Sequence, residues 1–280
     1  MIADWQFALA GAIALSIGVG VAIAVEELLW MKRHGRLTRA ARREMFMSLS
    51  PLPPNVLVSI ALSGWWVFVY SEAARFAITP VATSLAMLLP ALLLADLCYY
   101  MEHRTAHRFQ PLWMLYHAMH HSSPDYTVAT AYRVSFLNQF VAPLFYLPCV
   151  LAGFEPLLVV GMQVFTIHYQ AWVHTRAIGR LPLLYAFLNT PANHRMHHDI
   201  SMPAGVNYGG IFVIWDRLFG TYVEPREVHA FGIAGREPPG NWRELYTRPF
   251  VGQELPDTSA VAKARASNSP KSSGCSPTPM

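Results

Sequence analysis

Long uncharged hydrophobic runs alternate with short polar segments along most of this chain. Residues 5–25 carry no charged side chain, and this length is enough to cross a bilayer, which takes about 20 residues. A second run covers residues 56–78 and a third covers residues 81–101, with Thr79 and Pro80 as the turn between them. The pattern therefore predicts three membrane-spanning helices in the N-terminal part of the chain.

A further hydrophobic stretch predicts a helical hairpin that enters the membrane and returns. Residues 135–154 are uncharged, a Glu-Pro pair interrupts the run, and it resumes over residues 157–175. Pro143 and Pro148 predict kinks or a re-entrant path, because proline removes a helical hydrogen bond. The expected fold is all-α, with about four to five transmembrane or re-entrant helices and a cytoplasmic helical cap.

Composition supports an integral membrane protein, since 53% of the residues are hydrophobic and only 14% are charged. A soluble chain averages about 25% charged residues. The three cysteines, Cys98, Cys149 and Cys275, are far apart in the sequence and form no CxxC pair. They predict neither a disulfide framework nor a thiolate zinc site.

Basic residues follow the first hydrophobic run and determine the expected topology. Only Asp4 precedes the run, whereas six basic residues follow it closely: Lys32, Arg33, Arg36, Arg39, Arg42 and Arg43. The positive-inside rule places the N-terminus outside and this basic block in the cytoplasm. Because two more spans follow, residues after position 101 emerge on the cytoplasmic side as well.

The same pattern divides the chain into four parts. Residues 1–31 form the first transmembrane helix and residues 32–54 a basic cytoplasmic linker. Residues 55–254 form one domain that holds the remaining hydrophobic runs. Residues 255–280 are rich in Ser, Pro, Ala and Lys, and this composition predicts a disordered tail.

Eight of the twelve histidines fall into three short clusters beside the hydrophobic runs. One reads HxxxH and two read HxxHH: His103 and His107; His117, His120 and His121; His194, His197 and His198. Residues three or four apart share one face of a helix, so each cluster presents several imidazoles together. Three such faces hold more nitrogen ligands than one metal can bind, which predicts two metals.

The location of these clusters favours iron and oxygen chemistry. Neutral imidazole suits iron, zinc, copper and nickel alike. A histidine-rich dinuclear site at a membrane surface is suited to O2 activation on a hydrocarbon dissolved in the bilayer. The residues therefore indicate two iron ions acting on a lipid.

Several residues outside the clusters are candidates for supporting roles. Asp96 lies on one helical stripe with Tyr100 and the first cluster, and we expect its carboxylate to accept a hydrogen bond from a ligand histidine. His168 and His174 are six residues apart and lie on different helix faces, so at most one completes the site. His34 and His229 follow no pattern and are expected at the surface.

The C-terminal motif residues have two interpretations each. Asn207 bonds either a ligand or the backbone of the loop, and plain turn chemistry explains this residue almost as well. Asp216 pairs either with an arginine or with a ligand histidine. Thr190 and Pro191 predict an N-cap and first helical residue for the helix that carries the third histidine cluster.

Four motifs together resemble the fatty acid hydroxylase/sterol desaturase superfamily: DLCYYMEHRTAH, HAMHHSS, NTPANHRMHH and NYGGIFVIWDRLFGTY. The resemblance covers roughly residues 90–225. The stretch YQAWVHT at residues 169–175 is most similar to the alkylglycerol monooxygenase-like branch. Some relatives in that branch have another histidine where this chain has Asn193.

The resemblance implies a non-haem di-iron enzyme that hydroxylates or desaturates a lipid C–H bond with O2. It favours His174 over His168 as the additional ligand. It also implies an external electron donor, which is a cytochrome b5-like or ferredoxin-like protein or a reduced pterin. The partners expected are therefore the membrane, a lipid substrate and this donor, and no nucleic acid.

Two other functions remain open from the sequence. A metal transporter would place its ligands at the bilayer midplane or in a histidine-rich loop. A bis-histidine haem electron carrier needs single histidines facing each other across spans. The substrate is also open among sterols, fatty acyl chains, sphingoid bases, ether lipids and carotenoids.

Overall fold

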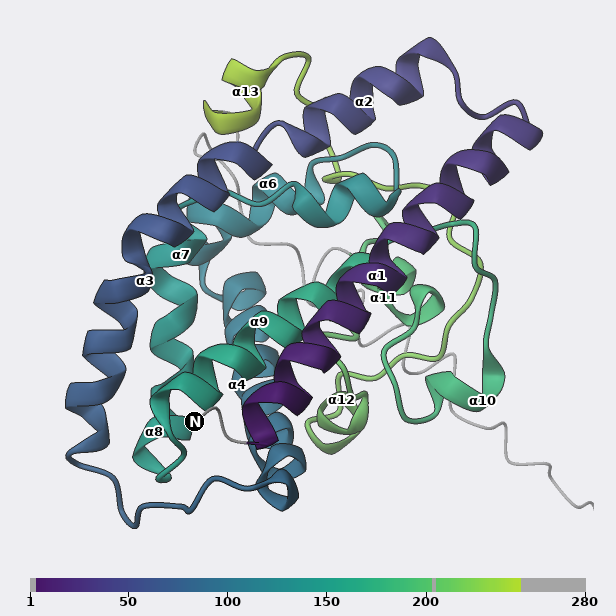
Figure 1. Cartoon of the computed structure of the whole chain (residues 1–280). Coiled ribbons are helices and arrows are strands. Elements are labelled where there is room, and N and C mark those ends of the chain that lie inside the picture. The colour runs from purple at the N-terminus through teal and green to yellow at the C-terminus, as the bar shows by residue number, and fades with distance from the viewer. Residues whose placement is uncertain (1–3, 203–204, 248–280) are drawn as a thin grey trace, which may run out of the picture.

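The computed structural model describes residues 4–202 and 205–247 (Figure 1). Helices make up its regular secondary structure, and the two β-bridges in these ranges are isolated pairs. The all-α prediction is therefore confirmed for the part of the chain that the structure describes. The expected tail over residues 255–280 lies outside the described residues.

Three helical segments are long and apolar enough to cross a membrane. The first is α1 (Asp4–Arg33), and the second joins α2 (Arg39–Leu49) to α3 (Leu52–Ala74). The third joins the 3-10 turn η1 (Leu85–Met87) to α4 (Leu88–Arg108). Three spans were expected, and the chain is an integral membrane protein.

The third span begins later than the sequence indicates and ends later. Helix starts at Leu85 instead of residue 81, because the preceding residues bond to the end of α8 (Leu147–Leu151) and the turn after it. The amide of Ile78 donates to the carbonyl of Leu151, and the amide of Val81 donates to that of Gly153. At its other end α4 continues to Arg108, so it carries the first histidine cluster out of the span.

The predicted hairpin is present, and its first arm is broken into short pieces. They are α7 (Asn138–Val141), the 3-10 turn η4 (Ala142–Tyr146) and α8 (Leu147–Leu151), and the second arm is the continuous α9 (Pro156–Val173). Prolines lie in the first turn of η4 and of α8, as the expected kinks require. Glu155 caps α9 by accepting from the amide of Leu158.

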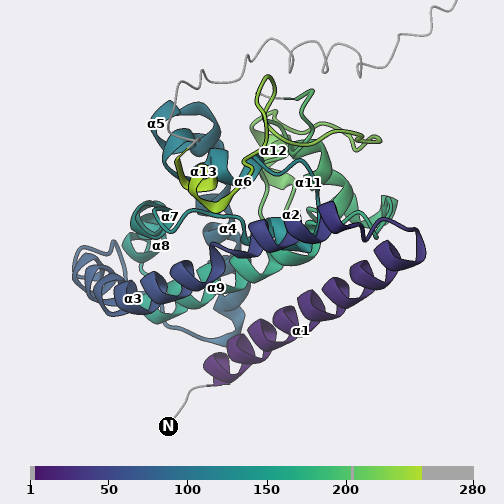
Figure 2. The ribbon, with the colours of Figure 1, turned by 90° about the horizontal axis from the view of Figure 1, so that it is seen from above.

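Helix α9 packs against both α1 and α4 and lies between them (Figures 1 and 2). The core under it comes from α3, α4, α8 and α9, and includes Tyr70, Ala95, Cys149 and Leu158. Cys98 and Cys149 are free thiols whose sulfurs lie 3.6 Å apart in this core. The cysteines therefore meet in space, although they are distant in sequence.

Short helices carry the second and third histidine clusters and cover the end of α4. After α4 come α5 (Gln110–Leu112), the π-helical turn η2 (Trp113–His117), α6 (Ala118–His121) and the 3-10 turn η3 (Val128–Tyr132). After α9 come α10 (Pro182–Tyr185), α11 (Pro191–His197), α12 (Ile214–Leu218) and α13 (Trp242–Thr247). The cluster helices α6 and α11 are thus separate elements that converge on α4.

Candidate metal centre

The structure gathers nine histidines into two adjacent buried groups. In each group the available nitrogens lie within 4.8 Å of one another, which is close enough to hold a metal ion. The first group contains His103, His107, His117, His121 and His197. The second contains His120, His174, His194 and His198. These nine are the histidines that the sequence and the family resemblance single out.

Each HxxHH cluster contributes to both groups. On α6 and the turn before it, His117 and His121 belong to the first group and His120 to the second. The third cluster reverses this division, since His194 and His198 belong to the second group, and His197 belongs to the first. In each cluster the two histidines that are four positions apart belong to the same group. The histidine between them, three positions after the first, belongs to the other group.

Local sequence explains how the third cluster is presented. Thr190 caps α11, where its amide and hydroxyl both donate to the side-chain carbonyl of Asn193. Pro191 occupies the first turn, as predicted, because its missing amide hydrogen is not needed there. Asn193 therefore serves as part of the helix cap.

The second cluster is carried by an unusual helical turn. Residues 113–117 form a π-helix, and the amide of Ala118 donates to the carbonyl of Trp113. One wide turn of this kind shifts the rotation of the following α6 relative to a regular α-helix. His117 therefore lies in the π-helical turn, whereas His120 and His121 lie in the α-helix α6.

Within each group, the imidazole nitrogens of different histidines point toward one another. In the first group the Nε2 atoms of His107 and His117 lie 2.8 Å apart, and those of His197 and His121 lie 3.1 Å apart. In the second group the Nε2 of His174 lies 3.0 Å from that of His194 and 3.2 Å from that of His120. Such convergence of acceptor nitrogens is characteristic of a metal site.

Backbone carbonyls orient three of the rings from behind. The Nδ1 atoms of His103, His174 and His197 lie within hydrogen-bond distance of the carbonyls of Tyr208, Gln170 and Val206, at 2.9, 2.7 and 2.8 Å respectively. Each carbonyl fixes Nδ1 as the protonated nitrogen, which leaves Nε2 free to bind a metal.

Several buried ring nitrogens have no hydrogen-bond partner within the described structure. They include Nε2 of His103 and of His198 and Nδ1 of His107, His120 and His194. A buried nitrogen without a partner costs free energy unless something binds it. A metal ion in each group would supply a partner for nitrogens that face the group, so the residues fit a dinuclear metal site.

Burial also keeps these rings in the form that binds metals. Desolvation lowers the pKa of His120, His121 and His198 well below the usual histidine value, and neighbouring imidazoles lower it further. For His174 burial lowers the pKa to about 4. The rings are therefore neutral at physiological pH, and neutral imidazole is the metal-binding form.

Asp96 has different partners from those expected. Its carboxylate accepts from the amides of Ile211 and Phe212 and from the indole N–H of Trp215, and these partners in the described part of the chain include no histidine. The expectation that Asp96 orients a ligand histidine directly is therefore wrong. It anchors the segment that follows Tyr208, whose carbonyl orients His103.

Asp216 and Asn207 also bind backbone rather than an arginine or a histidine. Asp216 accepts from the amides of Tyr208 and Gly209 and from the Thr221 hydroxyl. Desolvation raises the pKa of Asp216 to about 6. Asn207 has a φ of +53°, and its side chain bonds to the amide and carbonyl of Val223, 16 residues further along the chain.

The remaining histidines lie outside both groups. His168 is half-buried and its Nδ1 lies 2.8 Å from the carbonyl of Val164 on the same helix. His34 and His229 are exposed, as predicted. The structure therefore brings His174, and not His168, to the clustered histidines.

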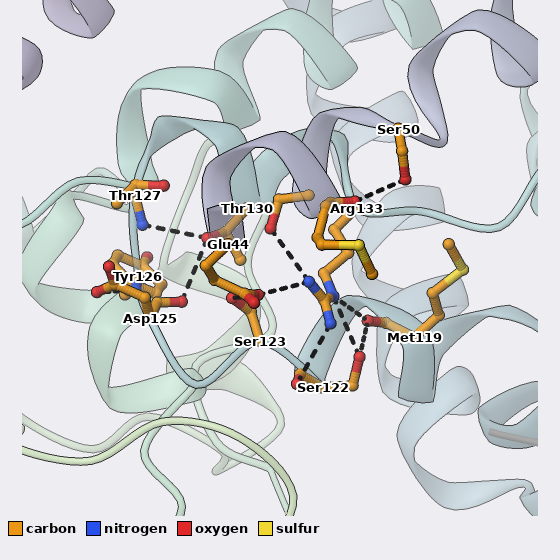
Figure 3. A network of polar contacts seen from close by, with 12 residues as sticks. Glu44, Ser50, Met119, Ser122, Ser123, Asp125, Tyr126, Thr127, Thr130 and Arg133 are labelled. Atoms are coloured by element: carbon orange, nitrogen blue, oxygen red, sulfur yellow. Dashed lines mark hydrogen bonds and ion pairs between the residues drawn. The ribbon is translucent and has the colours of Figure 1, made fainter. Parts of the chain in front are cut away.

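Arg133 supports the second cluster from behind and was missed in the sequence (Figure 3). This fully buried guanidinium forms an ion pair with Glu44 at 2.6 Å. It also donates to the Ser122 hydroxyl and to the carbonyl of Met119, the residue before His120. An arginine followed by a hydrophobic run was the only sequence signal available, and it indicates a membrane boundary equally well.

Glu27 supports the site from α1. Its carboxylate accepts from the hydroxyl of Thr175, next to His174, and from the amide of Val128. Only 2% of Glu27 is exposed. The C-terminal end of α1 therefore lies against the histidine-bearing elements, although α1 carries no candidate ligand.

Comparison with known proteins agrees with this geometry. The family model described as fatty acid hydroxylase matches residues 88–221, which contain all nine clustered histidines. Residues 88–221 are therefore similar to the fatty acid hydroxylase family. The chain is also 35% identical over 213 residues to the alkylglycerol monooxygenase of Homo sapiens, covering 75% of this chain and 46% of that protein.

Two further relatives of the fatty acid hydroxylase segment differ in their named substrates. Alkylglycerol monooxygenase of Xenopus tropicalis is 40% identical over 140 residues, covering 49% of this chain and 31% of the relative. The ornithine lipid hydroxylase of Rhizobium tropici is 32% identical over 163 residues, covering 57% of this chain and 49% of the relative. The chain thus spans less than half the length of these relatives. No solved structure matches the chain.

Proposed function

We propose that this chain is a membrane-bound di-iron oxygenase that hydroxylates a C–H bond of a lipid. The supporting observation is the pair of adjacent groups of buried, neutral imidazoles at the end of a membrane-spanning helix. Every clustered histidine is a proposed iron ligand, with five in the first group and four in the second. Iron bound there would supply O2 activation and oxidation of an unactivated carbon.

The protein's own contribution is to hold and shield these ligands. The carbonyls of Tyr208, Gln170 and Val206 keep three rings in one tautomer and orientation. All nine rings are buried, so bulk water is kept from the metals. Asp96 and Asp216 act indirectly, because they fix the backbone of residues 208–212 behind His103.

An ether lipid of glycerol is the leading substrate class. Alkylglycerol monooxygenases are among the relatives with the highest identity, and the other named relative acts on an ornithine lipid. Both names describe insertion of oxygen into a lipid, so we propose hydroxylation in preference to desaturation. A reduced pterin, a cytochrome b5-like protein or a ferredoxin-like protein is proposed as the source of electrons.

We propose that the N-terminus lies outside and the histidine groups lie on the cytoplasmic side. The basic residues after α1 favour this orientation. Contacts of Glu27 with Thr175 and Val128 keep the end of α1 on the same side as the histidines. The donor would therefore meet the enzyme from the cytoplasm.

The geometry argues against the haem carrier considered above. A porphyrin has to fit between two opposed imidazoles, whereas here the Nε2 atoms of facing rings are about 3 Å apart in both groups. A transporter needs ligands that release metal along a path. These histidines are buried in groups of four and five, and backbone carbonyls of other residues hold three of the rings.

Metal content and turnover of the purified chain test the proposal. The iron-loaded protein should contain two irons per chain, show no Soret band and hydroxylate an alkylglycerol in lipid vesicles with O2 and each candidate donor. His120→Ala and His197→Ala each remove one ring, from the second and first group respectively. Both should lose turnover and iron while still inserting into membranes.

His168→Ala is the matched control, since it removes a histidine that belongs to neither group. It should retain iron and turnover close to the unmodified protein. Full activity of both His120→Ala and His197→Ala would contradict the proposal. So would a Soret band, or a loss of iron in His168→Ala equal to that of the cluster variants.

A further inference from the structure

A patch of exposed hydrophobic side chains lies outside the three spans, on α10 and α12. Leu183 is 88% exposed, Phe187 73% and Leu218 68%. These exposed fractions equal or exceed that of Ile60 in the second span, which is 67% exposed. We call Leu183, Leu184, Phe187, Ile214 and Leu218 the α10–α12 surface.

The segment after α10 is joined to the start of α12 by backbone hydrogen bonds. The amide of Val213 donates to the carbonyl of Phe187 at 3.0 Å, and Leu188 and Phe212 form an antiparallel bridge. The ends of α10 and α12 therefore meet. In a soluble protein an exposed patch of large hydrophobic residues marks an interaction surface.

The depth of this surface follows from its attachment to α4. Asp96 binds the amides of Ile211 and Phe212 and the indole of Trp215, at the start of α12. Asp96 is eight residues after Leu88, so it lies about 12 Å along a span that crosses about 30 Å of hydrocarbon. Figure 1 shows α12 beside the lower part of α4, far from α2 at the top of the view.

The backbone near α12 is satisfied as membrane burial requires. Non-helical backbone inside a membrane is tolerated only where protein groups bind its polar atoms. Asp96 binds the amides of residues 211 and 212, and Gln170 donates to the carbonyl of Gly210. Asn189 donates to the carbonyls of Gly209 and Gly210. These three side chains are buried, so this loop does not depend on water for its hydrogen bonds.

We infer that the α10–α12 surface is inserted in the membrane and that its occupant is the hydrocarbon of lipid acyl chains. The surface continues the lipid-facing exterior of the spans at the depth of Asp96. In this arrangement the segment that carries the third histidine cluster is seated partly within the leaflet instead of resting above it. The backbone that orients His103 and His197 lies directly behind this surface.

Spin labels on the whole chain in lipid nanodiscs test the inference. Leu183→Cys and Leu218→Cys are introduced singly after replacement of Cys98, Cys149 and Cys275. Ile60→Cys on α3 is the lipid control, and Glu227→Cys, at an 84% exposed side chain, is the aqueous control. Collisions with O2, which concentrates in hydrocarbon, and with a water-soluble nickel chelate are then measured for each label.

Labels at Leu183 and Leu218 should lose nickel collisions and gain O2 collisions to the level of Ile60→Cys. Nickel collisions equal to those of Glu227→Cys would overturn the inference, because the surface would then face water. Low collision rates with both reagents would overturn it as well, since protein would then cover the surface. In that case the labelled chain is diluted with unlabelled chain. If the dipolar broadening between labels then disappears, the covering protein is a second copy of this chain. No turnover is measured, so this outcome is independent of the proposed oxygenase activity.

Discussion

Single backbone carbonyls determine which ring nitrogen is available in the proposed di-iron centre. His174 lies at the end of α9, and the carbonyl of Gln170, four residues earlier, holds its Nδ1. His168 has the same type of bond to Val164, yet it lies in neither group. The bond to a carbonyl therefore orients a ring, but only its position at the helix end brings His174 to the other clustered histidines.

Asp216 provides a pH-dependent test at the residue scale. Burial raises the pKa of Asp216 to about 6 from an ordinary value of 3.8, so the folded state binds its proton more tightly than the unfolded state does. This contribution to stability is full below pH 4 and is lost as the pH rises through 6, by about 3 kcal/mol in total. Thermal unfolding between pH 4 and pH 7 measures it.

Asp216→Asn cannot titrate, so the difference in melting temperature between the unmodified chain and this variant should change over that interval. The unmodified chain should lose stability relative to the variant as the pH rises. A constant difference from pH 4 to pH 7 would contradict the assigned role of burial. The amide also places N–H groups toward the donors of Tyr208 and Gly209, so the variant should be less stable at neutral pH.

At the scale of elements, α6 is the short helix on which both metal groups depend. It carries His120 for one group and His121 for the other, and it is only four residues long. A helix of this length has little stability of its own. Arg133 and its partner Glu44 on α2 therefore hold it in place (Figure 3).

Arg133→Leu should lower the iron content of both groups together. Removing one partner of a buried ion pair costs about 3–5 kcal/mol, because the other charge stays buried without its partner. Arg180→Leu is a matched control, since Arg180 pairs with Glu224 in an exposed bridge. Metal analysis and thermal unfolding should show a large loss for Arg133→Leu and little change for Arg180→Leu. Equal behaviour of the two variants would show that Arg133 does not support α6.

Gly153 couples the loop before α4 to the turn between α8 and α9. Its φ is +104°, and an added Cβ would lie 1.9 Å from the carbonyl oxygen of Thr79. Gly153→Ala should therefore lower the free energy of unfolding by more than 1 kcal/mol, as estimated for strained backbone. Gly179→Ala meets nothing within 4 Å and serves as the control. A melting temperature of Gly153→Ala equal to that of the control would contradict this contact.

At the scale of the whole molecule, support for the centre extends beyond the fatty acid hydroxylase segment. The match begins at residue 88, yet Glu27 on α1 binds Thr175, next to His174, and Glu44 on α2 binds Arg133. We propose that the N-terminal helices serve the site as well as anchoring the chain. This is a reason to test activity on the whole chain.

The C-terminal tail is predicted to be dispensable. Deleting residues 256–280 should leave iron content and turnover nearly unchanged, because the composition of this segment cannot form a packed core. Both quantities are measured on the truncated and complete chains in the same lipid. A severalfold loss of turnover with normal iron content would show that the tail takes part in substrate or donor binding.

The sequence by itself determined the helical class, the three spans and the identity of the clustered histidines. These features depend on hydrophobic runs and on residues three or four positions apart, which local helix geometry controls. Thr190, Asn193 and Pro191 also specified the start of α11. Such signals act within one or two turns of chain, so they can be predicted before the fold is known.

Only the tertiary structure decided how the histidines are divided and what holds them. The assignment of His120 and His197 to opposite groups depends on the angles at which α4, α6 and α11 meet, and those angles are set by packing. Backbone carbonyls and the partners of Asp96 carry no sequence signal, since every residue has the same amide groups. Contacts between distant segments were therefore the information that the sequence alone did not provide.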